Sequence, residues 1–491
     1  MLKSKKIELL APAGNLEKMK TALAFGADAV YAGIPDFSLR TRINDFDLEK
    51  IAEAADFCHK EGKKIYITIN VFAHNRHLEK LPAHIKKLKK IKVDALIISD
   101  PGIIAITKEI WPEAEIHLST QANCTNWRAA EFWQAQGVKR VILGRETTLE
   151  EIREIHTRVP GLELEYFVHG AMCMAYSGRC FLSAYYAERS ANLGDCVQPC
   201  RWKYDQVLNG ECRMPSGERR AASGECRMLN EVVENKSFLF SELGLRSERG
   251  DEFEVVEEEH GSYILNSKDL CLIKYIKQLK EAGISSFKIE GRAKSVYYQA
   301  LVAGIYARAI ELIDKKNTKI VQDEIDFLYG ELEKKLVHRG YTTGFLLEGK
   351  AGQNLASAHE KSEWEFCGQV LANGEFRMSN GEFRMPNGEF RMPSGEFRVS
   401  SGEFRVSSDE RRVSNFGFKN VICIKVHNSI KIGDEIEIVK PKYDIIKMKV
   451  EKLWDAKNGA NVSSAHGGQG AEVLLEAEGV VEEFSVVRRK V

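Results

Sequence analysis

The sequence lacks an excess of charge of either sign. Its 491 residues include 71 Lys and Arg and 71 Asp and Glu, so no field over the whole molecule attracts nucleic acid. An RNA partner would therefore have to bind a local basic patch. With 44% hydrophobic and 29% charged residues, the composition is typical of a globular protein, and the length predicts roughly two or three domains.

The sequence also lacks long hydrophobic runs. No window approaches the roughly 20 apolar residues of a membrane-spanning helix. The N-terminal segment MLKSKKIELLAPAG carries three lysines but passes directly into a strand-like segment, without the cleavage site of a signal peptide. We therefore expect no membrane partner and a cytoplasmic location, where the 11 cysteines would be thiols or metal ligands rather than disulfides.

Several familiar catalytic motifs are missing. The chain contains no H-E-x-x-H, no G-x-S-x-G and no phosphate-binding G-x-x-x-x-G-K-S/T, and no dinucleotide-binding fingerprint stands between a strand and a helix. Each of these motifs supplies a metal site, a nucleophile or a phosphate cradle. Their absence argues against hydrolysis by a familiar protease route.

A seven-residue unit recurs in two arrays. It reads NGEFRMP or SGEFRVS between Asn373 and Val413, and GECRMPS in an earlier array between Gly210 and Met228. Because Gly stands in almost every unit, a helix would be interrupted repeatedly, and we interpret both arrays as surface insertions with little fixed structure. Cys212 and Cys226 belong to the repeat and are not counted as ligands.

The first part of the chain, residues 1–340, alternates short apolar runs with amphipathic stretches. The helical stretches Leu16–Phe25 and Leu48–Lys60 each follow a capping residue, Asn15 and Asp47. This alternation predicts a (β/α)8 TIM-like barrel in preference to an open doubly wound sheet. The expected strands are Ile7–Ala11, Ala29–Ala32, Lys64–Asn70, Ala95–Ser99, Glu115–Ser119, Arg140–Leu143, Glu163–Val168 and Ser286–Glu290.

The C-terminal part shows a strand pattern without helices. GDEIEIV, KMKVEKLW and AEVLLEA alternate with period two and are separated by turn residues. We expect a linker at 341–364 and a small C-terminal β-barrel at 365–491, which carries the repeat insertion 373–413. The first array lies in an insertion of the large barrel at 206–250. The appended barrel could grip a partner or serve only as a structural cap.

Four cysteines stand close together in the segment His169–Tyr204. Cys173, Cys180, Cys196 and Cys200 fall within 28 positions. A structural zinc usually takes two close pairs of ligands, and only the second pair has that spacing. An iron–sulfur cluster tolerates wider spacing because it needs only four converging thiolates. The spacing favours an iron–sulfur cluster, with a zinc site or buried apolar cysteines as the alternatives.

This cysteine segment follows the seventh expected strand and so lies at the C-terminal mouth of the barrel, where barrel enzymes carry their chemistry. Cys271 is a reserve ligand. The arginines at this rim could bind a carboxylate or a phosphate, which favours an anionic substrate. His169 could act as a general acid or base, or only bind a loop carbonyl. The candidate rim residues are Arg145, Glu146, His169, Arg179, Glu290 and Arg292, although each alone could be an ordinary loop residue.

Short motifs occur along almost the whole chain outside the two arrays. They are ELLAPAGN, GADAVYAG, FSLRTR, HLSTQ, GRE, FVHGAMCMAYSGRC, CVQPCRW, NSKDL, FKIEGR and GDEIEI. In these motifs the chain resembles the collagenase-like proteins that are classed as peptidases of unassigned mechanism. Within that family it is most similar to the prephenate-dependent tRNA uridine hydroxylases.

The resemblance implies an enzyme that forms 5-hydroxyuridine at the wobble position of tRNA, with a 4Fe–4S cluster as cofactor and prephenate, a small dicarboxylate, as co-substrate. It implies Cys173, Cys180, Cys196 and Cys200 as the cluster ligands and leaves the other rim residues without assigned roles. Sister proteins hydroxylate a cytidine of ribosomal RNA or act in ubiquinone synthesis. A collagenase-like peptidase, a ribosomal RNA hydroxylase and a non-catalytic RNA-binding protein with a structural cluster are the alternatives.

Overall fold

The computed structural model describes most of the chain outside the repeat arrays. The first array, with Cys212 and Cys226, and the second array beyond its first units lie outside the described residues. The expectation of little fixed structure is wrong for the first units of the second array, because β14 Trp364–Glu375 extends into it and β15 Arg377–Ser379 pairs with β16 Glu382–Arg384. The described residues are 6–35, 37–39, 45–201, 204–208, 243–247, 252–254, 267–315, 318–347, 351–352, 360, 362–375, 377–379, 382–384, 420–477 and 479–491.

Parallel strands form a closed barrel in the first domain, which confirms the predicted (β/α)8 fold. Strand β12 pairs with both β1 and β7, so the sheet order returns on itself. All eight expected strands are present, with ends that differ by one or two residues. The barrel strands are β1 Glu8–Pro12, β2 Ala29–Gly33, β3 Lys64–Ile69, β4 Ala95–Ile98, β5 Ile116–Leu118, β6 Arg140–Ile142, β7 Glu163–Gly170 and β12 Ile284–Ile289.

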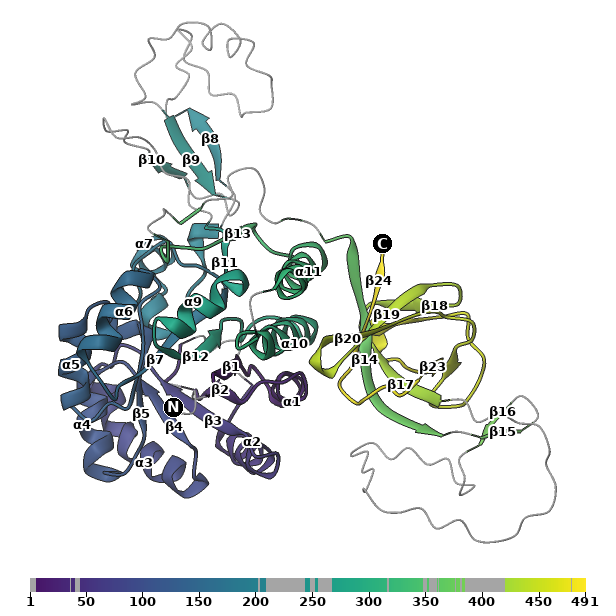
Figure 1. Cartoon of the computed structure of the whole chain (residues 1–491), viewed down its shortest axis with the longest axis horizontal. Coiled ribbons are helices and arrows are strands. Elements are labelled where there is room, and N and C mark those ends of the chain that lie inside the picture. The colour runs from purple at the N-terminus through teal and green to yellow at the C-terminus, as the bar shows by residue number, and fades with distance from the viewer. Residues whose placement is uncertain are drawn as a thin grey trace, which may run out of the picture.

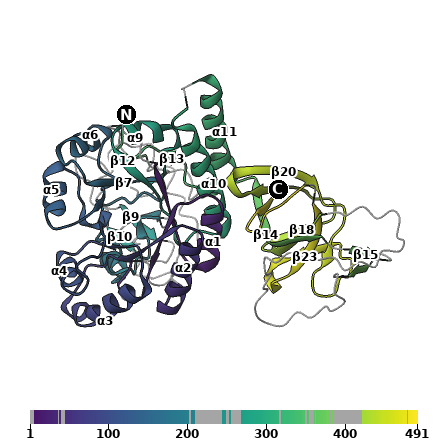
Figure 2. The same ribbon diagram turned by 60° about the horizontal axis from the view of Figure 1, so that its bottom comes forward.

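Helices surround this barrel (Figure 2). The Asn15 and Asp47 side chains accept hydrogen bonds from the backbone N–H of Lys18 (2.9 Å) and Lys50 (2.8 Å), so both predicted N-caps are confirmed. No helix of the described residues is long and apolar enough to span a bilayer. The helices are α1 Leu16–Ala24, α2 Leu48–Lys60, α3 Asn75–Ile91, α4 Pro101–Ile110, α5 Trp127–Ala135, α6 Leu149–Arg158, α9 Ile276–Glu281, α10 Val296–Leu312 and, outside α10, α11 Lys319–Lys335.

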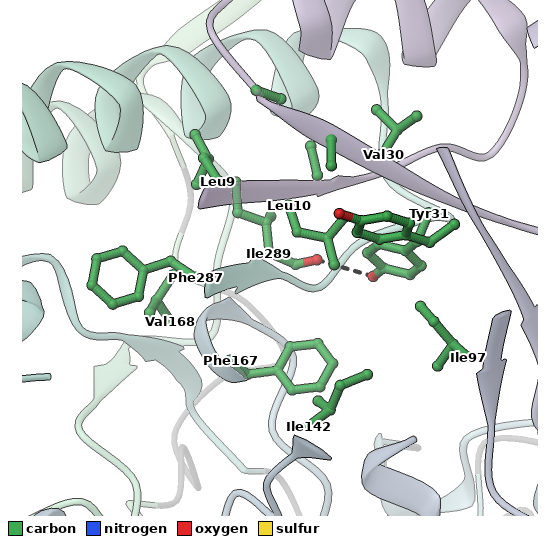
Figure 3. Close-up of a cluster of buried hydrophobic side chains, with 14 of the residues drawn as sticks. Leu9, Leu10, Val30, Tyr31, Ile97, Ile142, Phe167, Val168, Phe287 and Ile289 are labelled. Atoms are coloured by element: carbon green, nitrogen blue, oxygen red, sulfur yellow. Dashed lines mark hydrogen bonds between the residues drawn. The ribbon is translucent and has the colours of Figure 1, made fainter. Parts of the chain in front are cut away.

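The core of the barrel combines apolar packing with buried polar contacts. Figure 3 shows Leu9, Leu10 and Phe287 among the buried side chains, and the Tyr31 hydroxyl, which donates to the Ile289 carbonyl at 2.9 Å and so joins β2 to β12. This contact ties together two strands that are separated by β1 in the sheet. The strand ends that carry the candidate site therefore stand on a rigid support.

The second domain is an antiparallel sheet that curves into a half-barrel (Figure 1), which confirms the small appended β-domain. Its apolar residues form a core of their own. Strands β18 Ser429–Lys431 and β22 Ser464–His466 pair beside the sheet. The sheet order is β20 Asp444–Lys449, β19 Glu435–Lys440, β24 Val486–Lys490, β14 Trp364–Glu375, β17 Asn420–Val426, β23 Glu472–Ala477 and β21 Trp454–Asp455.

A buried ionic network joins the two domains. Arg488, on β24, contacts Glu331 of α11 at 2.7 Å and Glu437 of β19 at 2.7 Å. Lys335 of α11 also binds Glu437, at 2.7 Å. Tyr443 belongs to the apolar core of the large barrel and donates to Glu331 at 2.7 Å. The half-barrel is therefore packed firmly against α10 and α11.

The expected linker also contributes to the barrel sheet. Its first residues form β13 Tyr341–Thr342, which pairs with β11 Asp269–Cys271. Strand β11 in turn runs antiparallel to the end of β7. The chain around residue 340 thus lies beside the end of β7, close to the candidate site.

Candidate functional site

The four cysteines lie in one segment, residues 171–201, that follows β7 at the C-terminal end of the barrel strands. We call it the cysteine segment. It contains the short helix α7 Leu182–Ala187 and the 3-10 turns η3 Ala191–Leu193 and η4 Pro199–Arg201. Its cysteines are all free thiols, two of them exposed and two half-buried.

The first half of the cysteine segment is held by the ends of β5 and β6. Glu146, which follows β6, accepts hydrogen bonds from the Ser177 backbone N–H (2.7 Å) and hydroxyl (3.2 Å). Gly178 has a φ of +75°, and a Cβ at this position would lie 2.0 Å from the Gln121 carbonyl oxygen. Only glycine fits that close approach. The predicted site residue Glu146 therefore positions the loop between Cys173 and Cys180.

The second half of the segment is closed by local hydrogen bonds. Arg189 binds Asp195 through two contacts, at 3.0 and 2.6 Å. The Asn192 amide donates to the Cys180 carbonyl at 3.0 Å, so the turn that precedes Cys196 is fixed against the first half. These contacts bring the two halves of the cysteine pattern together.

The four thiols lie close enough to influence one another electrostatically. Burial raises the pKa of Cys200 to about 11, and the thiols of Cys173, Cys196 and Cys180 raise it further, while Arg201 opposes them. Burial likewise raises the pKa of Cys180, again with contributions from Cys196 and Cys173. Four thiolates that influence one another in this way would repel, so a bound cation or metal cluster would stabilise them.

Hydrogen-bond donors and cations surround the thiols. The Gln198 backbone N–H donates to the sulfur of Cys196 at 3.3 Å. The Nη1 atom of Arg145 lies 4.0 Å from the sulfur of Cys173, and the Arg145 guanidinium lies over the Phe167 ring, 4.0 Å from its centroid. Donors to sulfur and nearby charge are the features by which proteins tune thiolate-bound clusters.

The donor set fits an iron–sulfur cluster in its chemistry. Four thiols stand in one short segment, and those of Cys180 and Cys200 are influenced by the charge of others in it, so each would bind a different iron of a 4Fe–4S cube. In the part of the chain that the structure describes, no three His, Cys, Asp or Glu side chains are arranged around a position for a single metal ion. The reserve residue Cys271 is buried beside the Tyr306 hydroxyl at 3.9 Å, and burial raises its pKa to about 12.

His169 is buried behind the rim. Its ring packs against Tyr298, Tyr306 and Tyr341, with centroid distances of 5.9, 5.6 and 5.5 Å. Burial lowers its pKa to about 3, and its Nδ1 atom has no hydrogen-bond partner among the described residues. The imidazole is therefore neutral at pH 7, and any part that it plays in proton transfer starts from the neutral form.

Glu290 lies next to the point where the cysteine segment leaves the barrel. Its carboxylate accepts a hydrogen bond from the Ala171 backbone N–H at 3.4 Å, and its carbonyl accepts one from the Tyr298 hydroxyl at 2.7 Å. Gly170 has a φ of +111°, and a Cβ there would lie 2.6 Å from the Glu290 carbonyl oxygen. Glu290 thus lies directly under the start of the segment.

Arg292 differs from the free anion clamp that the sequence suggests. Its guanidinium donates to the hydroxyls of Ser38 (3.1 Å) and Thr68 (3.3 Å) and to the Leu39 carbonyl (2.6 Å). The Leu39 N–H donates in turn to the Asn70 side chain at 3.2 Å. Much of the hydrogen-bonding capacity of Arg292 therefore holds the loop after β2 against the barrel.

The side chain of Arg179, unlike that of Arg292, is not engaged by the rest of the described structure. It is exposed, and its side chain makes no hydrogen bond or ion pair with the residues that the structure describes. It is thus placed to meet a ligand from solvent.

Three polar residues near the mouth were not predicted from the sequence. Asp269 and Arg339 form a buried ion pair beside β7, in which Arg339 Nε donates at 3.2 Å. Arg201 is half-buried, its Nε atom has no partner among the described residues, and burial lowers its pKa, with Arg339 as a second cause. The position of Arg201 directly after Cys200 was the available signal, whereas nothing in the sequence pairs Asp269 with Arg339.

Two profiles of one protein family match the chain. The profile of peptidase family U32 matches residues 14–356, and the profile of the peptidase family U32 C-terminal domain matches residues 411–488. The chain belongs to peptidase family U32. The first match covers the barrel with the cysteine segment, and the second covers most of the half-barrel.

Similar proteins cover most of the chain. A "tRNA hydroxylation protein P" of Haemophilus influenzae is 43% identical over 350 residues, 70% of this chain and 74% of that protein. The "tRNA hydroxylation protein P1" of Bacillus subtilis is 34% identical over 457 residues, 92% of this chain and 88% of that protein. The "23S rRNA 5-hydroxycytidine C2501 synthase" of Escherichia coli is 32% identical over 346 residues, 70% of this chain but 46% of that protein.

Proposed function

We propose that this protein is an RNA hydroxylase, and more specifically an enzyme that forms 5-hydroxyuridine at the wobble position of tRNA. In this proposal a 4Fe–4S cluster bound by Cys173, Cys180, Cys196 and Cys200 is the cofactor and prephenate is the co-substrate. A cytoplasmic location, where tRNA is modified, belongs to the same proposal.

The observation that carries the proposal is the placement of four free cysteines in one segment at the mouth of the barrel. The mouth is where TIM barrels place their catalytic groups, and the thiols have Arg145, Arg201 and an N–H donor around them. The 43% identical relative, whose name assigns it to tRNA hydroxylation, covers 70% of this chain. A purely structural metal would need neither this position nor these neighbours.

The residues of the site divide into those that hold the segment and those that face the ligand. Glu146 and Glu290 anchor the cysteine segment to the ends of β6 and β12. Arg145 and Arg179 supply positive charge at the rim, where a dicarboxylate would form charge-assisted hydrogen bonds. When bound, the cluster would supply one-electron transfer to or from the ligand beside it.

Two other functions compete with this one. The peptidase in the family's name would need an activated nucleophile, and the only histidine among the predicted site residues is buried and neutral, with a pKa of about 3. Hydroxylation of ribosomal RNA is favoured by the 32% identical relative, but this chain corresponds to 46% of that protein, against 74% and 88% of the tRNA relatives. The tRNA assignment therefore leads.

The first test concerns the cluster. Protein purified without oxygen should be brown and contain about four irons and four sulfides per chain. Replacement of Cys173 by Ser should remove most of the iron. Replacement of Cys423, a half-buried thiol of β17 in the other domain, should leave the iron content unchanged. Stoichiometric zinc without iron, or full iron in the Cys173 variant, would refute the cofactor assignment.

The second test concerns the product. Nucleosides of tRNA and of ribosomal RNA from a deletion strain should be compared by mass spectrometry. Loss of 5-hydroxyuridine from tRNA is the expected result. If a hydroxycytidine were lost from ribosomal RNA instead, the protein would be a ribosomal RNA hydroxylase and the tRNA proposal would be wrong.

A further inference from the structure

Three aromatic side chains of the cysteine segment point into solvent. Tyr176 is 66% exposed, and Phe181 and Tyr185 are each 74% exposed. They are the most exposed phenylalanine and tyrosine side chains of the described residues; the next is Phe132 at 54%. Phe181 and Tyr185 stand one helical turn apart at α7, and Tyr176 precedes them in the same segment. Exposed apolar groups in one segment are a feature of interaction surfaces. We call these three residues the aromatic platform.

The charge around the platform indicates the kind of partner. Arg179 lies between Tyr176 and Phe181 in the chain, is exposed, and makes no ion pair with the described residues. The Arg145 guanidinium lies beside Cys173 in the same segment. Aromatic faces interleaved with unpaired cations are the pattern by which proteins bind unpaired nucleotides: bases stack on the rings, and arginine meets phosphate or stacks as well.

The outer face of α3 is a second surface suited to binding nucleic acid. Between His74 and Lys92 the chain contains seven Lys or Arg residues and one acidic residue, Glu79, although the whole protein has no net charge. Lys86, Lys87 and Lys90 are exposed and form no ion pair with the residues that the structure describes. This face has the local positive charge that a sugar–phosphate backbone needs.

The platform and α3 adjoin each other. The Asn192 side chain binds the carbonyl of Cys180, the residue before Phe181, at 3.0 Å. The carbonyl of Asn192 accepts a hydrogen bond from the N–H of Phe72 at 2.9 Å, and Phe72 lies three residues before the start of α3. The cysteine segment therefore adjoins the start of α3, and Lys86, Lys87 and Lys90 lie further along the same helix.

We propose that Tyr176, Phe181 and Tyr185 stack on unpaired bases of an RNA loop and that the backbone of the same RNA continues along the basic face of α3. The proposal rests on the proposed function for the identity of the RNA and extends it by naming where the RNA binds. It places the loop on the segment that carries the four thiols. The half-barrel is then not the main RNA-binding surface.

The test measures RNA binding and not hydroxylation. Fluorescence anisotropy of the anaerobically purified full-length protein uses two labelled probes, a tRNA anticodon stem–loop and a fully paired duplex of equal length. Replacement of all three platform residues by Ala should weaken stem–loop binding at least tenfold, since stacking is lost, and should leave duplex binding nearly unchanged. The matched control is Phe132→Ala on α5. Tyr185→Leu, which keeps apolar bulk, and Tyr185→Phe, which keeps the ring, test stacking should the triple variant fold poorly.

The basic helix is tested by salt dependence. Replacement of Lys86, Lys87 and Lys90 by Gln should weaken binding of both probes. The slope of log affinity against log salt should fall by about 0.7 to 0.9 for each phosphate that the variant no longer neutralises. The matched control is a triple Gln variant of three exposed lysines across the barrel, at α10 and α11 (Figure 2). Those residues are Lys315, Lys319 and Lys334.

The outcomes separate this proposal from the proposed function. Equal stem–loop affinity of the platform variant and the Phe132 variant, or no preference of the wild-type protein for the stem–loop over the duplex, overturns the platform. An unchanged salt slope in the α3 variant overturns the backbone path. If the variants behave as expected but the deletion strain keeps its 5-hydroxyuridine, the RNA surface stands and the proposed reaction fails.

Discussion

The Nη1 atom of Arg145 lies 4.0 Å from the sulfur of Cys173, and the same guanidinium lies 4.0 Å from the centroid of the Phe167 ring. The ring fixes the arginine at the end of β6, so its positive charge is held beside a predicted cluster ligand. A fixed cation stabilises the more negative of two redox states. We therefore expect Arg145 to tune the potential of the proposed cluster.

We predict that Arg145→Gln lowers the midpoint potential of the cluster and retains the iron, because the variant removes charge but no ligand. Arg145→Lys, which keeps the charge, should restore most of the potential. A spectroscopic redox titration measures both. An unchanged potential in Arg145→Gln would show that the arginine has no influence on the cluster.

The buried His169 should make the protein less stable in acid. Its pKa is about 3 in the folded state against an ordinary 6.5, so above pH 6.5 both states are neutral and the histidine carries no penalty. As the pH falls from 6.5 towards 3, the unfolded chain takes up a proton that the folded chain does not. The free energy of unfolding should then fall by up to about 1.4 kcal/mol per pH unit.

The His169→Gln variant should lose this part of the pH dependence. Urea unfolding at several pH values, compared between wild type and variant, isolates the contribution of His169 from that of His117, whose pKa is also lowered by burial. If the free energy of unfolding changed equally with pH in both proteins between pH 6.5 and 4, the conclusion that His169 is buried and neutral would be contradicted.

The two rim arginines Arg292 and Arg179 should respond differently to replacement. Arg292→Ala removes three hydrogen bonds of a buried guanidinium, to the Leu39 carbonyl and to the hydroxyls of Ser38 and Thr68, which should cost about 1–3 kcal/mol of stability. Arg179→Ala removes an exposed side chain, so the melting temperature should stay the same while use of the small acid falls by about tenfold. Thermal unfolding and the dependence of hydroxylation on prephenate measure the two effects. If Arg179→Ala lowered the stability and Arg292→Ala affected only the use of prephenate, both assignments would be wrong.

The ionic network between the domains should contribute strongly to stability. Arg488→Met leaves Glu331 and Glu437 short of a buried partner, and removal of one member of such a network costs about 3–5 kcal/mol. The control, Lys490→Met, breaks an exposed pair with Glu363 and should cost less than about 1 kcal/mol. Urea denaturation gives both values, and equal effects would show that the network does not hold the domains together.

The barrel could be predicted from the sequence because the patterns that specify its strands and helices each lie within a short stretch of the chain. Each strand is a short apolar run, and the caps Asn15 and Asp47 stand directly before their helices. The four cysteines were identifiable for the same reason, since they lie within one segment. The sequence did not reveal contacts between residues that are distant along the chain, such as Arg292 with Leu39 or Asp269 with Arg339. No local sequence pattern indicates which partner a buried charged side chain will contact.

Exposure was equally hidden from the sequence. Phe181 and Tyr185 are residue types that are usually buried in a core. The sequence gives no sign that both side chains are exposed to solvent in the folded cysteine segment. His169 shows the converse, since a polar residue at a strand end was expected at the rim but is enclosed by three tyrosine rings. Side-chain direction at the end of β7 is set by its pairing with both β12 and β11.

The measurement that tests the account most directly is mass spectrometry of tRNA nucleosides from a deletion strain complemented with three forms of the gene. The account predicts that 5-hydroxyuridine is lost in the deletion strain, restored by the wild-type gene and by Cys423→Ser, and not restored by Cys196→Ser. Unchanged 5-hydroxyuridine in the deletion strain, or full restoration by Cys196→Ser, would contradict the claim that the four thiols at the barrel mouth serve tRNA hydroxylation.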